Sequence, residues 1–127
     1  MAQIFISYDH DDVWFAKEVR RILESEGFTV WMDDEIGFGS LWSPEIDKQI
    51  KEAKIIVVVV TPDANRSTYV TYEWSYALGL GRKVIPIYHK TTTRMHKQLA
   101  DIQYCDLRKA VPENWKKLVD KATELIA

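Results

Sequence analysis

The chain has 127 residues, the size of one compact domain with a single core. Apolar residues make up 46% and charged residues 28%, which excludes a disordered chain. The net charge of −2 supplies no excess of lysine and arginine for nucleic acid or an anionic membrane, so we expect neither as a partner. Cys105 is the only cysteine, which excludes an intrachain disulfide and favours a reducing, cytoplasmic setting.

The first half of the chain predicts two strands, each followed by a helix. Gln3–Ser7 is a short apolar run, and the acidic run Asp9–Asp12 offers carboxylates that can cap a following helix. Gly27 is placed to end that helix, whose apolar residues share one face: Phe15, Val19, Ile22 and Leu23. Phe28–Met32 predicts the second strand, and Ser43-Pro44-Glu45 is typical of a helix start.

The second half continues the alternation. Ile55–Val60 is wholly apolar and β-branched, which predicts a central strand, and it is too short to span a membrane. Strands are also expected at Lys83–Tyr88 and Ile102–Cys105. Two further helices are expected, one ended by Gly79 and one after Pro112, with apolar stripes formed by Val70, Trp74, Ala77 and Leu78, and by Trp115, Leu118, Val119, Ala122, Leu125 and Ile126. The sequence therefore predicts one α/β domain over residues 1–127, a flavodoxin-like three-layer fold whose central parallel sheet of about five strands is covered by helices on both faces.

Ligands of such sheets bind beyond the carboxyl ends of the strands. We expect four loop segments to meet there: 7–12, 33–42, 61–69 and the loop after Tyr88. In the helix after Tyr69, the residues Tyr69, Glu73 and Tyr76 follow one another at helical spacing beside the apolar stripe. Glu73 is thus predicted at the border of core and cleft, where a partly desolvated carboxylate is often functional. The alternative is a solvated glutamate, or one paired with a nearby lysine or arginine.

Sequence blocks in order along nearly the whole chain resemble those of Toll/interleukin receptor (TIR) domains. They are Ile4-Phe5-Ile6-Ser7-Tyr8, Val30-Trp31-Met32-Asp33, Ser43-Pro44-Glu45-Ile46 and Ser67-Thr68-Tyr69-Val70-Thr71-Tyr72-Glu73-Trp74. The last block looks more like prokaryotic, NAD⁺-cleaving members than like receptor adaptors. One departure lies within it, because Tyr69 stands where tryptophan is commoner.

The resemblance implies that Glu73 is the catalytic residue and that Ser7 and Tyr8 line the nicotinamide end of the site. It also implies that the segment from Asp33 to Trp42 serves ligand access and self-assembly. We further expect Asp33, Trp42, Ser67 and Tyr69 to contact the substrate. Trp42 could stack on a ring or pack on the second helix. Gly37-Phe38-Gly39-Ser40 lacks the proline that many members carry before the loop glycine.

The implied function is NAD⁺ glycohydrolase or cyclase activity in immune or cell-death signalling, such as antiphage defence. One carboxylate suffices, because the nicotinamide of NAD⁺ is already a cationic leaving group. It therefore needs no general acid to protonate it, whereas the leaving group of an ordinary glycoside does. NAD⁺ would be the substrate, with no cofactor and no metal. Apolar loop residues would support self-association (Ile36, Phe38 and Leu41), and a longer chain could carry a fused sensor or effector domain. The alternatives are a non-catalytic TIR scaffold and a nucleoside deoxyribosyltransferase-like enzyme.

Other signals favour no rival function. Gly37-Phe38-Gly39 and Gly79-Leu80-Gly81 lack the placement and residues of phosphate-binding loops. A phospho-accepting receiver domain would need an aspartate at the end of its third strand, where this chain has Thr61-Pro62. The three histidines fall in separate loops, which favours surface positions over metal ligation: His10, His89 and His96.

Overall fold

The computed structural model describes residues 2–33 and 43–127. Within them, five parallel strands form one sheet in the order β2-β1-β3-β4-β5. The strands are β1 (Ile4–Ser7), β2 (Val30–Met32), β3 (Ile55–Val60), β4 (Lys83–Tyr88) and β5 (Cys105–Asp106). This is the doubly wound order of flavodoxin-like folds, so the predicted fold class is confirmed.

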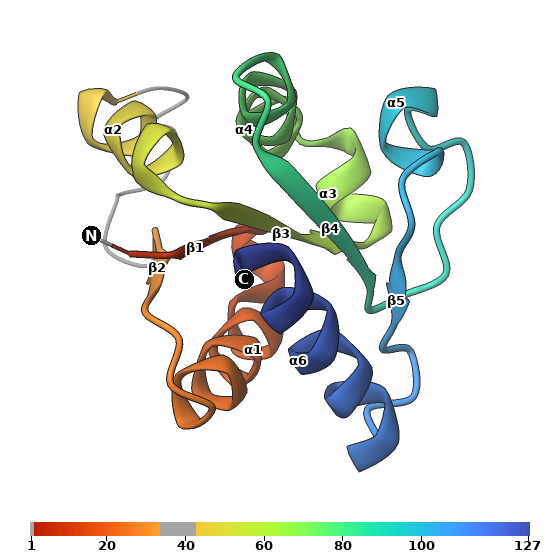
Figure 1. The fold of residues 1–127 in the computed structure, drawn as a ribbon. Coiled ribbons are helices and arrows are strands. Elements are labelled where there is room, and N and C mark those ends of the chain that lie inside the picture. The colour runs from red at the N-terminus through yellow and green to blue at the C-terminus, as the bar shows by residue number, and fades with distance from the viewer. Residues whose placement is uncertain (1, 34–42) are drawn as a thin grey trace.

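Helices cover both faces of the sheet (Figure 1). One face carries α1 (Val13–Ser25), which follows the short 3₁₀ helix η1 (His10–Asp12), and α6 (Pro112–Ile126). The other face carries α2 (Pro44–Glu52), α3 (Pro62–Arg66), α4 (Thr68–Gly79) and α5 (Lys97–Ala100). None of the helices in the described ranges has the length and apolar character needed to cross a lipid bilayer.

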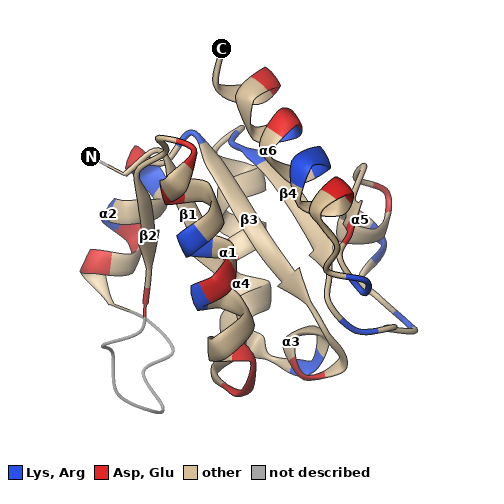
Figure 2. Ribbon diagram, turned by 90° about the horizontal axis from the view of Figure 1, so that it is seen from below, with Lys and Arg blue, Asp and Glu red and all other residues tan. Residues whose placement is uncertain are grey.

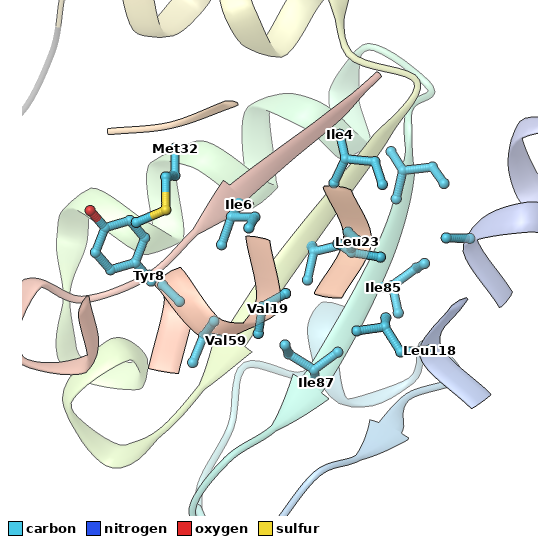
Figure 3. Close-up of a cluster of buried hydrophobic side chains, with 14 of the residues drawn as sticks. Ile4, Ile6, Tyr8, Val19, Leu23, Met32, Val59, Ile85, Ile87 and Leu118 are labelled. Atoms are coloured by element: carbon cyan, nitrogen blue, oxygen red, sulfur yellow. The ribbon is translucent and has the colours of Figure 1, made fainter. Parts of the chain in front are cut away.

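The three layers enclose two apolar clusters, one on each side of the sheet. Figure 3 shows the cluster between the sheet and α1 and α6, where Ile6, Val19 and Leu118 pack together. On the opposite side, Phe5 of β1 packs with residues of α2 and α4. All six residues of β3 are buried. In Figure 2 β3 carries no charged residue, as expected of a strand covered on both faces.

Most of the predicted elements are confirmed, with local corrections. Gly27 adopts φ +93° and ends α1, since its amide donates to the Glu24 carbonyl and the next amide to Leu23. The fifth strand lies at Cys105–Asp106, not Ile102–Cys105, and β2 begins at Val30, not Phe28. The sequence did not predict α3 or α5, because helices of five and four residues are too short to show a periodic apolar face.

Candidate active site

Glu73 and Ser7 meet at the carboxyl edge of the sheet, although they lie 66 residues apart in the chain. Ser7 is the last residue of β1, and its side chain lies on the α4 side of the sheet, the same side as Phe5 two residues earlier. Its Oγ donates a 2.6 Å hydrogen bond to Glu73 Oε1. Ser7 is 0% exposed and Glu73 2%, so the predicted partly desolvated carboxyl is in fact fully buried.

The surroundings of Glu73 favour the protonated acid. Burial raises the pKa of the Glu73 carboxyl well above its ordinary value. The hydrogen bond from Ser7 lowers this pKa, and the negative charge of Asp33 raises it. The arrangement therefore holds a carboxyl group whose ionisation depends on what lies next to it, and such groups cluster at functional sites.

Asp33 joins both layers of helices at this edge. It follows β2 directly, and its backbone carbonyl accepts a 2.7 Å hydrogen bond from the Tyr8 hydroxyl. Its carboxylate Oδ2 accepts a hydrogen bond from the Tyr69 hydroxyl. Tyr8 packs in the apolar cluster of α1 and α6 (Figure 3), whereas Tyr69 packs against the cluster of α2 and α4. The structure thus brings five of the predicted residues together: Ser7, Tyr8, Asp33, Tyr69 and Glu73.

Tyr69 lies one helical turn before Glu73 on α4. Burial raises the pKa of its phenol, and the hydrogen bond to Asp33 and the negative charge of Glu73 raise it further. The electrostatic coupling places Tyr69, Asp33 and Glu73 in one local environment. Two carboxyl groups and two phenols in such a cluster can accept hydrogen bonds from sugar hydroxyls and can stabilise positive charge.

Of the remaining two predicted site residues, the structure describes Ser67 but not Trp42. Ser67 is the N-cap of α4, where its Oγ accepts a 3.1 Å hydrogen bond from the Val70 amide. This bond gives Ser67 a structural role, and its predicted contact with substrate stays a prediction. Trp42 lies outside the described residues, as do the loop residues proposed for assembly: Ile36, Phe38 and Leu41.

Sequence reasoning missed a second polar cluster at the same edge. Asp9 caps the short helix η1, where its carboxylate accepts from the Asp11 amide, and not α1, the helix for which a cap was predicted. Asp12 caps nothing. It is buried, and its Oδ2 accepts a 2.6 Å hydrogen bond from Thr61 at the end of β3. Lys90 Nζ lies 3.8 Å from Asp12 Oδ1. The sequence did carry one signal for this cluster, because the polar residue Thr61 directly follows the buried strand β3. The Thr61 hydroxyl also caps α3, since it accepts a hydrogen bond from the Ala64 amide.

His10 and His96 are exposed, as predicted for surface histidines, whereas His89 is partly buried. The ring of His89 stacks on Phe15 with centroids 3.8 Å apart, and burial lowers the pKa of its imidazole. His96 contacts Trp74. His10 lies with Asp9 and Asp11 in a surface group whose ligand atoms are within 4.8 Å of one another. Exposed acidic groups of this kind are common without an ion, and the predicted absence of a metal stays a prediction.

Comparison with known proteins bears on both fold and family. A family model for the TIR domain matches residues 4–121. The TIR domain of the Toll-related receptor TRR-2 from Hydra magnipapillata superposes with a TM-score of 0.80 at 20% identity, covering 97% of this chain and 99% of that one. The TIR domains of the activated Roq1 resistosome, which recognises the effector XopQ, superpose with a TM-score of 0.74 at 19% identity, covering all of both chains.

A curated relative is more similar in sequence. It is named a probable 2′ cyclic ADP-D-ribose synthase, TcpO, from Methanobrevibacter olleyae, and it is 34% identical over 94 residues. The match covers 70% of this chain but only 28% of the relative. The family match spans all five strands of the sheet, and this chain belongs to the TIR domain family.

Proposed function

We propose that this domain cleaves NAD⁺ at the bond between nicotinamide and ribose, with Glu73 as the catalytic residue. The observation that carries the proposal is the buried Glu73 carboxyl, hydrogen-bonded to Ser7 at the carboxyl edge of the sheet beside Asp33 and Tyr69. The similarity to a relative named as a cyclic ADP-ribose synthase supports the same substrate. NAD⁺ is consumed in this proposal, and we propose no resident cofactor.

The charge of the substrate explains how a carboxyl that favours the protonated form can act as an anion. The nicotinamide ring of NAD⁺ is cationic, and a positive charge beside a carboxyl lowers its pKa. Binding would therefore oppose the rise in the Glu73 pKa that burial causes and would favour the carboxylate. The carboxylate then stabilises the positive charge that develops on the ribose as the glycosidic bond breaks and the electron pair leaves with nicotinamide.

Two kinds of nucleophile can complete the reaction. Water gives ADP-ribose, nicotinamide and a proton. A hydroxyl or ring nitrogen of the adenosine half of the same molecule gives a cyclic ADP-ribose, nicotinamide and a proton. The name of the relative favours the second kind, and we propose a cyclic product alongside or in place of the linear one.

We also propose roles for the other predicted site residues. We propose that Ser7 orients Glu73 and, with Tyr8, lines the nicotinamide end, and that Asp33 and Tyr69 contact the ribose. Ser67 and Trp42 remain proposed contacts on the strength of the family resemblance. We further propose that the domain acts in the cytoplasm in immune or cell-death signalling and that it self-associates. The solved relatives described as a resistosome and as a TIR heterodimer of RPS4 and RRS1 support self-association.

The test is incubation of concentrated protein with NAD⁺, and separately with deoxynucleosides, followed by chromatography for nicotinamide or free base. Release of nicotinamide that is lost in Glu73→Gln supports the proposal. The matched control is Glu113→Gln, which removes an exposed carboxylate from the first turn of α6. Free base from deoxynucleosides alone would indicate a deoxyribosyltransferase-like enzyme. No turnover of either substrate at any protein concentration would leave a scaffold that acts only through contacts between TIR domains.

A further inference from the structure

The described structure shows the proposed catalytic group in a position that substrate cannot reach. Glu73 is 2% exposed, and Ser7, its hydrogen-bond partner, is 0% exposed. A ribose hydroxyl has to approach within hydrogen-bond distance of the Glu73 carboxyl for the reaction, about 2.5–3.0 Å between oxygens. Some side chain next to Glu73 therefore has to move before NAD⁺ can bind.

The side chains that meet beside Glu73 are joined to each other. Tyr69 precedes Glu73 by one turn of α4, and its hydroxyl donates to the Asp33 carboxylate. Tyr8, which packs in the apolar cluster of α1 and α6, donates from its hydroxyl to the Asp33 backbone carbonyl at 2.7 Å. Asp33 is thus fixed to the α1 layer through its main chain and to α4 through its side chain. The second of these links joins two groups that both lie close enough to Glu73 to interact with it electrostatically.

We propose that the hydrogen bond between Tyr69 and Asp33 is a latch that closes this site in the free domain and that opens when substrate binds. The inference rests on the proposed function only for the identity of the substrate. Asp33, released from Tyr69, would accept from a ribose hydroxyl instead, so that the substrate replaces the donor that it displaces. The Tyr69 hydroxyl thus closes the site, whereas its ring stays beside the bound ligand.

The two links to Asp33 differ in a way that singles out Tyr69. The Tyr8 bond goes to a backbone carbonyl, which every substitution at Asp33 retains. The Tyr69 bond goes to a carboxylate, and hydrogen bonds to charged acceptors are stronger than neutral ones. Loss of such a bond shifts an opening equilibrium by about tenfold or more toward the open form.

Chemical access to Glu73 measures the latch without any catalytic turnover. The full chain is treated with a water-soluble carbodiimide and glycinamide, and mass spectrometry follows the modification of Glu73 over time. Exposed Glu113 gives the rate of an unprotected carboxyl in the same sample. In Tyr69→Phe we expect Glu73 to react about tenfold faster than in the parent. Asp33→Asn, which removes the charge of the acceptor, should change the rate in the same direction.

The control is Tyr72→Phe. Tyr72 lies on the same helix and also donates to an aspartate, Asp47 of α2, at 2.7 Å. This variant removes the same kind of bond from α4 and should leave the Glu73 rate unchanged. Three results would overturn the latch: parent Glu73 reacting as fast as Glu113, equal Glu73 rates in the parent, Tyr69→Phe and Asp33→Asn, or equal acceleration in Tyr69→Phe and Tyr72→Phe.

Assay of the same variants with NAD⁺ separates the latch from the proposed function. If labelling is faster in Tyr69→Phe and no variant releases nicotinamide, the latch is supported and the proposed NAD⁺-cleaving function is contradicted. If nicotinamide release depends on Glu73 while Tyr69→Phe and Asp33→Asn leave the labelling rate unchanged, the proposed function is supported and the latch is contradicted.

Discussion

Thr61 donates a hydrogen bond of 2.6 Å to the buried carboxylate of Asp12, and this bond ties the start of α1 to the end of β3. The same Thr61 oxygen accepts from the Ala64 amide at the start of α3. One hydroxyl therefore holds two of the loops that border the candidate active site. A buried carboxylate that loses such a donor retains its desolvation cost without compensation.

Replacement of Thr61 by valine should lower the free energy of unfolding by roughly 1–3 kcal/mol, because Asp12 and the first turn of α3 both lose a partner. Thr61→Ser keeps the hydroxyl and should cost much less. Urea denaturation followed by circular dichroism gives both values. If the valine variant were as stable as the parent while the serine variant were less stable, packing of the threonine methyl group, and not the hydrogen bonds, would be the contribution of Thr61.

Glu73→Gln should reduce nicotinamide release by roughly 10²-fold or more, because it removes the charge that stabilises the ribose cation. It should also remove part of the pH dependence of stability. The pKa of Glu73 is raised by folding, so its stabilising contribution is complete below the ordinary value of about 4.3 and is lost as pH rises through the raised value. The variant should therefore be at least as stable as the parent at neutral pH.

Thermal melts of parent and Glu73→Gln over a pH series test the second part. The difference between the two melting temperatures should grow in favour of Glu73→Gln as pH rises from the acid range. Retention of most activity by a folded Glu73→Gln protein would exclude Glu73 from the mechanism.

Ser7→Ala should move the acid limb of the pH profile of kcat/KM to higher pH. The hydrogen bond from Ser7 lowers the pKa of Glu73, so its removal raises that pKa further, and the carboxylate forms only at higher pH. Asp33→Asn removes a negative charge that raises the same pKa and should shift the limb to lower pH. Nicotinamide release measured across pH in both variants checks the signs, and coincident profiles would show that neither residue controls Glu73.

Turnover should depend on an aromatic ring at position 69. Tyr69→Trp keeps a flat aromatic side chain beside Glu73 and should be tolerated. Tyr69→Ala should impair turnover well beyond its effect on stability. The measurement is nicotinamide release per folded molecule, with the folded fraction taken from a melting curve. Losses of activity and of folded protein in equal proportion would make Tyr69 purely structural.

Self-association should make activity rise faster than linearly with protein concentration. Phe38→Asp, at a position outside the described residues, should suppress turnover in dilute solution, because a carboxylate is costly in an apolar contact. Fusion to an oligomerising partner supplies effective concentration without new contacts and should restore part of the activity. Constant specific activity over a roughly hundredfold dilution, with Phe38→Asp equal to the parent, would mean that one domain holds a complete site.

The sequence predicted the elements that have a local signal. The β-branched run of β3 and the apolar stripe of α6 define their elements without reference to the rest of the chain. The two-residue strand β5 was displaced in the prediction because its extent depends on pairing with β4, where Ile87 lies opposite Cys105. No local pattern marks that register.

The sequence predicted which residues meet at the site better than it predicted how they are arranged there. Helical spacing placed Glu73 beside the core, and topology placed Ser7 at the same edge. The complete burial of Glu73 was not predicted, since its neighbours Ser7 and Asp33 come from segments that are distant from it in the chain. The hydrogen bond between Asp12 and Thr61 likewise could not be predicted from residue spacing, because the two residues lie 49 positions apart.

The central position of β3 has a consequence for hydrogen exchange. Its backbone is flanked by β1 and β4, and both of its faces lie under helices, so its amide hydrogens have no local route to solvent. Their exchange should require opening of the whole domain, whereas amides near the ends of short helices such as α5 exchange through small local openings. The protection of Ile56 to Val59 should therefore report the global stability of the domain, and ligand binding should slow exchange there even though no ligand touches these residues.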